Sequence, residues 1–227
     1  NMSMGSIDVN IMTKVDRENY FRGEKLPIEF NDAHAAVRGF ALSDLDSTLI
    51  LSAGMNPKLY NYLEQFEDFY PDATGAFKKK IALKVSDYRS AFIQGKYLAN
   101  KGLWVSEFRI ESGLNCGGHA FATDGFLMGP ILAEFRDKRE ELSTTLREIY
   151  CKALTVKKRQ IPATLPAVKI TAQGGVGTAS EHQFLLEHYQ LESIGWGTPF
   201  LLVPEATTVD EPTLHQLLLA REDDLYT

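Results

Sequence analysis

The segment Ile170–Thr178, with the sequence ITAQGGVGT, decides the fold class of this chain. It begins as an apolar strand, turns through Gly174, Gly175 and Gly177, and reaches Thr178, a residue type that commonly precedes a helix. Glycines let a backbone approach an anion closely, and the N–H groups of such a turn and of the helix start point toward it. The segment therefore predicts a strand–turn–helix unit with a phosphate site, although the glycines could serve only a tight turn.

A second glycine turn follows about twenty residues later, in Ile194–Thr198 with the sequence IGWGT. Two consecutive turns of this kind are how TIM barrels commonly build a phosphate site, after their seventh and eighth strands. The pair favours phosphate binding more than either turn alone.

Short β-rich runs alternate with helical patterns along the rest of the chain. Several of the runs are apolar almost throughout, which is typical of strands in a parallel sheet covered by crossover helices. The predicted strands are Ile7–Thr13, Ser47–Gly54, Lys80–Ser86, Trp104–Ser112, Ala167–Gly175 and Glu192–Leu202. The predicted helices are Pro57–Phe66, Tyr88–Asn100, Gly129–Leu154, Ser180–His188 and Thr213–Ala220.

The helix predicted over Gly129–Leu154 is long and amphipathic, and we expect it to pack on the sheet. Arg17–His34, with mixed charges, Gly23 and Pro27, is expected to be an irregular surface excursion. The inner face of the long helix is assigned to Ile131, Phe135, Leu142, Leu146, Ile149 and Ala153.

Composition limits the class of protein. The 227 residues are 44% hydrophobic and 24% charged, as expected for a single globular domain over residues 1–227. A net charge of −6 argues against a nucleic-acid partner. The two cysteines, Cys116 and Cys151, have neither disulfide-framework nor metal-site spacing, and the chain shows no signal peptide and no membrane span. We expect a cytoplasmic protein; a homo-oligomer is left open.

The segment Glu111–His119, with the sequence ESGLNCGGH, follows the strand predicted over Trp104–Ser112. Catalytic groups of barrel enzymes lie at this end of their strands, and a loop so rich in glycine is not explained by packing. A histidine near its ordinary pKa can take a proton from a carbon acid at neutral pH. His119 is therefore the candidate base, against the alternative that it only caps the next element.

The order of these motifs resembles a known family. GGH after a strand, then a strand with GGVGT, then a strand ending in GT-Pro-Phe, is similar to nitronate monooxygenases and the related flavin-dependent enoyl-acyl-carrier-protein reductases, which are FMN-binding TIM barrels. Asp8–Met12 looks like their VNLL or VNIM strand. The resemblance spans most of residues 7–202.

The resemblance implies an FMN cofactor across the barrel mouth and a role for each matching residue. Backbone N–H groups at Gly174, Gly175, Gly197 and Thr198 would hold the phosphate, and His119 would be the catalytic base. Asn10, Glu111 and Gly118 would lie near the flavin. Lys84, a cation within an apolar strand, would contact the flavin ring and stabilise its anionic reduced form.

Three features depart from the family pattern. The stretch between the His119 loop and the GGVG turn is about one extended helix longer than compact family members need. Cys116 stands where the family has a small residue before GGH. The first strand here matches the third strand of the family, so we expect an α/β fold of the TIM (β/α)₈ type that lacks its first two strands in this chain.

The function expected from the resemblance is FMN-dependent oxidation of a nitronate, nitroalkane or similar carbon acid. The alternatives are reduction of an enoyl thioester with NAD(P)H, and a non-catalytic barrel that binds a phosphorylated metabolite. Asp44–Thr48 also matches the DxDxT loop of haloacid-dehalogenase phosphatases, but the clear strand follows this loop instead of preceding it. A charged turn entering a strand is the better interpretation.

Overall fold

A computed structural model describes residues 5–12, 15–111, 115–116, 119–120, 128–174, 176–196 and 210–221, the two short pairs by backbone alone. The chain divides into two compact units. Unit 1 contains Asn1–Arg109 and Asp137–Lys169, and unit 2 contains Ile110–Arg136 and Ile170–Thr227. Within the described ranges, no helix combines the length and the apolar character needed to cross a membrane.

Each of the six predicted ranges contains a strand, and these strands belong to one sheet of order β1-β4-β5-β6-β9-β10. The last one covers only Ser193–Gly195 of the predicted Glu192–Leu202, of which residues 197–202 lie outside the described residues. Neighbours in the sheet follow one another in the chain order, and β1–β4, β4–β5 and β9–β10 are paired in parallel. The predicted α/β class with a parallel sheet is therefore confirmed, while the TIM (β/α)₈ type, lacking its first two strands in this chain, stays a prediction. The strands are β1 (Val9–Ile11), β4 (Ser47–Leu51), β5 (Lys79–Val85), β6 (Val105–Glu111), β9 (Lys169–Gln173) and β10 (Ser193–Gly195).

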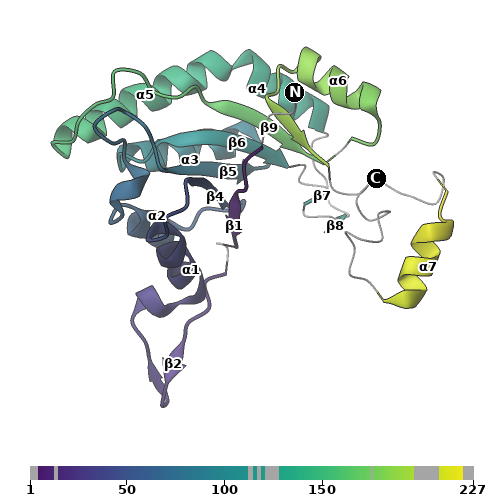
Figure 1. Cartoon of the computed structure of the whole chain (residues 1–227). Coiled ribbons are helices and arrows are strands. Elements are labelled where there is room, and N and C mark those ends of the chain that lie inside the picture. The colour runs from purple at the N-terminus through teal and green to yellow at the C-terminus, as the bar shows by residue number, and fades with distance from the viewer. Residues whose placement is uncertain are drawn as a thin grey trace. The chain divides into compact units, whose positions relative to one another are not determined.

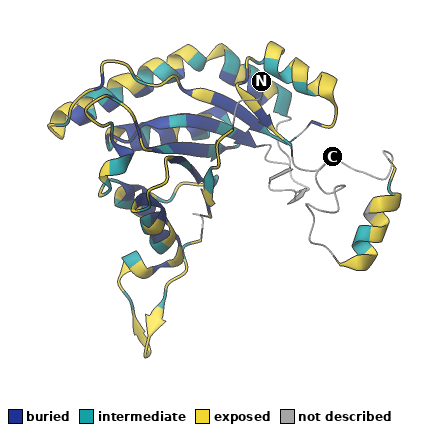
Figure 2. Cartoon of the chain, viewed as in Figure 1, coloured by how far each residue is buried: buried dark blue, intermediate teal, exposed yellow. Residues whose placement is uncertain are grey.

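Unit 1 packs helices on one face of its strands, and Figure 2 shows the burial concentrated in those strands. The helix α3 begins where Asp87 accepts a hydrogen bond from the Ser90 amide at 2.6 Å, and it covers the predicted span. Gly95 of α3 lets the Phe108 ring and the Leu146 side chain come close, because a Cβ there would meet them at 3.0 and 3.1 Å. The helices of unit 1 are α1 (Asp32–Ala41), α2 (Pro57–Leu63), α3 (Tyr88–Asn100) and α5 (Arg139–Val156), with short 3₁₀ turns at Ile28–Phe30 and Glu67–Phe69.

The single long helix predicted over Gly129–Leu154 is wrong, because α4 (Met128–Asp137) ends before Lys138 and α5 begins after it. Lys138 leaves helical geometry, with φ −107° and ψ 11°. Its carbonyl accepts a hydrogen bond from the Tyr88 hydroxyl at 3.5 Å, and its ammonium lies over the Tyr88 ring. The buried stripe of α5 is Leu142, Leu146, Tyr150 and Leu154, whereas Ile149 and Ala153 are half-buried.

The region Arg17–His34 is more ordered than predicted. A small antiparallel hairpin, β2 (Tyr20–Phe21) and β3 (Glu24–Lys25), extends from unit 1, as the purple ribbon in Figure 1 shows. Arg22 and Gly23 form its tip with φ angles of 52° and 84°, the left-handed region that a tight two-residue turn requires. The helix α1 then begins at Asp32, where the sequence suggested irregular structure.

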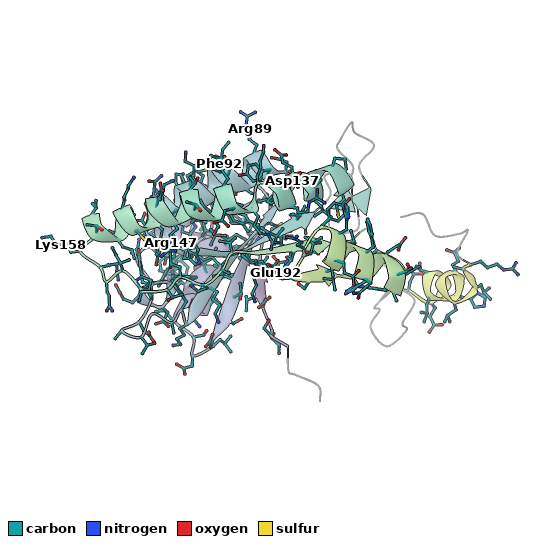
Figure 3. All side chains as sticks on the ribbon, turned by 90° about the horizontal axis from the view of Figure 1, so that it is seen from above. Arg89, Phe92, Asp137, Arg147, Lys158 and Glu192 are labelled. Atoms are coloured by element: carbon teal, nitrogen blue, oxygen red, sulfur yellow. The ribbon has the colours of Figure 1, made fainter. Side chains whose placement is uncertain are left out.

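The outer surface of the helical layer carries charged side chains. Figure 3 shows Arg89 at the start of α3 pointing away from the ribbon, and Arg147 of α5 is exposed as well. This distribution is the ordinary amphipathic arrangement, with charge facing water and apolar side chains facing the strands.

Unit 2 contains β9, β10, α4 up to Arg136, and the helix α6 (Ala179–His188). The Arg136 guanidinium lies 3.2 Å from the Nε2 atom of His188, donates to the His188 carbonyl at 3.3 Å, and lies over the Tyr189 ring. These contacts hold the C-terminal end of α6 against α4. Unit 2 also contains the short strands β7 (Asn115–Cys116) and β8 (His119–Ala120), and α7 (Glu211–Leu219).

Candidate functional site

The two glycine turns follow adjacent parallel strands. β9 pairs with β10 so that Gln173 lies opposite Gly195, and both strands therefore end at the same edge of the sheet. Gly174 has φ +80°, a conformation that side chains rarely adopt, and a Cβ placed there would meet no heavy atom within 4 Å. Space beside a left-handed glycine is what a backbone approaching a ligand requires.

Some of the backbone donors in this region are already used. The Gly174 amide donates to the Gly195 carbonyl at 3.0 Å, which ties the first turn to the end of β10. Gly174 therefore shapes the turn through its conformation, and a phosphate would have to be held by other amides. Gly175, Gly197 and Thr198, the remaining predicted phosphate contacts, lie outside the described residues.

The start of α6 holds an anion from its own chain. Thr178 caps the helix, and the Glu181 carboxylate accepts hydrogen bonds from the Gly177 and Thr178 amides at 2.9 and 3.0 Å. These bonds lower the pKa of Glu181, the bond from Gly177 most. The Gly177 and Thr178 amides, at the start of the helix, are thus occupied by a side-chain carboxylate.

Trp196, directly after β10, is anchored to α6. Its indole Nε1 donates to the Nδ1 atom of His182 at 2.8 Å, and the two rings are 5.8 Å apart. The contact fixes the chain where it leaves β10 and enters the second glycine turn.

A polar face of the unit 1 sheet carries two of the predicted site residues. The register pairs Asn10 with Ile50 and Ile50 with Ala82, so Lys84, two residues beyond Ala82, lies on the same face as Asn10. The opposite face of β5 meets the helices, since the Lys79 ammonium donates to the Ser43 carbonyl at 2.9 Å, beyond the last residue of α1. Asn10 is exposed and Lys84 is half-buried.

β6 adds more charge to this face. Phe108 points toward Gly95 of α3, so Glu107 and Arg109 point to the other side of the strand. Arg109 pairs with Glu107 at 2.8 Å and with Asp8 at 3.4 Å.

The pair between Arg109 and Asp8 shows that the strands of unit 1 curl. Asp8 directly precedes β1, and β1 is separated from β6 by two strands. Three strand spacings amount to about 14 Å in a flat sheet. The sheet therefore curves toward the polar face, and this concave face is charged where barrel interiors are ordinarily filled by branched apolar side chains.

Glu111 is the last residue of β6, and alternation along the strand places it on the side of Glu107 and Arg109. It is 3% exposed. A carboxylate buried this deeply at the carboxyl end of a parallel strand lies where barrel enzymes carry functional groups.

The predicted base lies in a segment described only by its backbone. Residue His119 belongs to β8, which pairs antiparallel with β7 so that Cys116 lies opposite His119. The side chains of both residues, and all of Gly118, lie outside the described residues. The role of His119 stays a prediction.

The DxDxT match is a turn that enters a strand. Asp46 pairs with Lys80 at 3.0 Å and directly precedes β4, so it lies at the amino end of that strand. A phosphatase nucleophile would need the carboxyl end.

A second group of interacting polar residues, in unit 1, could not be predicted from the sequence. Asp16 accepts hydrogen bonds from the Ala33 amide at 2.8 Å and from the Nδ1 atom of His34 at 2.5 Å, and His34 is only 1% exposed. Both residues fall within or beside a segment without periodicity, and a buried hydrogen bond between a loop and a helix has no local pattern that could predict it.

No family model matches the chain, and neither a curated protein nor a solved structure matches it with significance.

Proposed function

We propose that the protein is an FMN-dependent oxidoreductase of the nitronate monooxygenase kind, acting on a nitronate, a nitroalkane or a similar carbon acid. One observation supports this most: β9 and β10 are adjacent and parallel, and each leads into a glycine turn at the same edge of the sheet. That arrangement is the common phosphate site of TIM barrels.

The residues around such a cofactor have distinct roles. Amides of the two turns other than those of Gly174, Gly177 and Thr178 would hold the phosphate, and the space beside Gly174 admits it without steric cost. Lys84, half-buried near the carboxyl end of β5, supplies a positive charge toward the ring, with Asn10 on the same face of the sheet. Bound FMN supplies the electron transfer.

His119 acts on the substrate in this proposal. As a neutral imidazole it removes the proton from the carbon next to the nitro group, and it becomes an imidazolium. The glycines before it let its loop come close to the substrate.

The test is the spectrum of the purified protein followed by an assay for product. We expect a flavin absorbance band that persists after desalting, and nitrite release from a nitroalkane under air. Flavin with NADH consumption and enoyl-thioester reduction, but without nitrite, would instead indicate a reductase. A colourless protein that gains no flavin band when FMN is added would contradict the proposal.

Replacing the base separates catalysis from cofactor binding. His119→Ala should keep its flavin and lose about a hundredfold or more in turnover, because proton abstraction is removed. His215→Ala, an exposed position on α7, is the matched control and should keep full turnover. Unchanged turnover in His119→Ala would remove this residue from the mechanism.

A further inference from the structure

A small hairpin of unit 1 exposes aromatic side chains that the proposed flavin chemistry does not use. It consists of β2 and β3, and all four of its strand residues are exposed, as the yellow ribbon in Figure 2 shows. Tyr20 and Phe21, which form β2, are 60% and 62% exposed. A two-stranded hairpin without a packed face is marginally stable in water, so pairing with a further strand would stabilise it.

The edges of this hairpin present backbone groups to solvent. The Leu26 amide donates to the Asn19 carbonyl at 2.9 Å, so these two residues form a hydrogen-bonded pair. Because such pairs alternate along antiparallel strands, the next pair, Tyr20 with Lys25, directs its backbone groups outward. Within the described residues this sheet has only two strands, so either edge can accept another strand.

The charges of the hairpin favour a second copy of this chain as the occupant. Residues 16–25 carry three acidic and three basic side chains, so the segment is neutral, whereas the whole chain has a net charge of −6. Two acidic copies repel one another over the rest of their surfaces. The neutral, aromatic hairpin is therefore a place where two copies can meet without that repulsion.

Two-fold symmetry determines which edge can pair with itself. In a symmetric dimer both copies use the same patch, so a strand on the axis lies antiparallel to itself. Pairing along β3 would set Lys25 opposite Lys25 of the second copy, and like charges directly opposite each other are unfavourable.

Pairing along β2 is favourable by the same criterion. It sets Tyr20 opposite Tyr20 of the second copy, which is an aromatic pair, and it brings Glu18 near Arg22 on both sides of the axis. The Arg22 guanidinium lies over the Phe21 ring, 5.2 Å from its centroid, so this positive charge stays beside β2.

We infer that the protein forms a weak two-fold dimer through β2, in which the two hairpins join into one four-stranded antiparallel sheet. The exposed parts of Tyr20 and Phe21 amount to about 250 Å² in each copy, or about 500 Å² in the dimer. Stable interfaces bury about 1,200 Å² or more. We therefore expect a dissociation constant on the order of 100 µM.

Sedimentation velocity of the full-length protein at increasing concentration measures the dimer directly. We expect the wild type to change from monomer to dimer between about 10 and 500 µM. Tyr20→Ser should weaken the dimer about tenfold by removing the central aromatic pair, and the exposed position keeps the fold intact. Ile93→Ser, at an exposed apolar position of α3, is the matched control and should leave the dimer unchanged.

A charge exchange tests the contact between Glu18 and Arg22. Arg22→Glu sets two carboxylates against each other at both contacts, and Glu18→Lys sets two cations there, so each variant alone should be monomeric. An equal mixture of the two variants restores opposite charges at both contacts and should dimerise as the wild type does.

Three results would each overturn the inference: a wild type that stays monomeric at the highest concentration, a dimer that Tyr20→Ser does not weaken, or a mixture of the charge variants that stays monomeric. None of these measurements depends on flavin, so failure here is distinct from failure of the proposed function.

Discussion

The two pairs of parallel strands, β1–β4 and β9–β10, end in regions of opposite character. After β9, the amides at the start of α6 are satisfied by Glu181, a carboxylate from the same helix. After β1, the walls of a cavity are held by hydrogen bonds to Asp16, and the Oδ1 atom of the Asn31 side chain is buried without a donor among the described residues. Both regions lie at carboxyl ends of parallel strands, but at the start of α6 the chain's own carboxylate already uses two backbone donors, so a phosphate after β9 and β10 would have to be held by other amides of the glycine turns.

The largest expected effect concerns the framework of the β1–β4 region. Asp16→Ala should lower the free energy of unfolding by about 3 kcal/mol, because it leaves the His34 ring and the Ala33 amide buried without an acceptor. Urea denaturation of the wild type and the variant measures this difference in the free energy of unfolding. Asp46→Ala, which removes an exposed ion pair with Lys80, should change stability by less than about 0.5 kcal/mol. Equal effects of the two substitutions would show that the buried pair is not what orders this region.

The next effect concerns the glycine turn after β9. Gly174→Ala should lower the free energy of unfolding by about 1–2 kcal/mol, because alanine is strained at φ +80° although space is free around it. Gly177→Ala is the matched control, since its Cβ would make an ordinary contact of 3.8 Å with Glu181. Thermal unfolding of the two variants checks the difference. A tolerated Gly174→Ala would show that the turn does not depend on the left-handed conformation.

The smallest effect concerns the carboxylate at the start of α6. The pKa of Glu181 is lowered in the folded protein, so its contribution to stability is present above its unfolded value of 4.5 and is lost as the pH falls through the lower folded value. Glu181→Gln should therefore reduce the loss of stability between neutral pH and about pH 3. Denaturation at several pH values tests this, with Glu148→Gln on the exposed side of α5 as control. An identical pH dependence in wild type and Glu181→Gln would contradict the account.

Much of the sheet could be predicted from the sequence because its strands are apolar and bounded by turn residues. The positions of all six strands and of α3 follow from local patterns, and Asp87 as N-cap explains why α3 begins where expected. The interruption between α4 and α5 at Lys138 could not be predicted, because Lys138 contacts Tyr88, a residue fifty positions away in the sequence.

The candidate site was predictable only in part. The glycine turns have a local signature, and alternation along strands places Lys84 on the polar face. The hydrogen bonds between Glu181 and the start of α6 could have been predicted, since Thr178 and Glu181 have capping-box spacing. Two other pairs depend on tertiary packing, so no sequence periodicity indicates them: Asp16 with His34, and Asp8 with Arg109.

The binding of FMN compared with riboflavin tests the central claim most directly. The two ligands share the ring and differ in the phosphate, so the difference isolates the glycine turns after β9 and β10. Quenching of flavin fluorescence during titration of the full-length protein measures both affinities. We predict that FMN binds at least about a hundredfold more tightly than riboflavin, equivalent to about 2.7 kcal/mol. Equal affinities, or no binding of either ligand, would contradict the account.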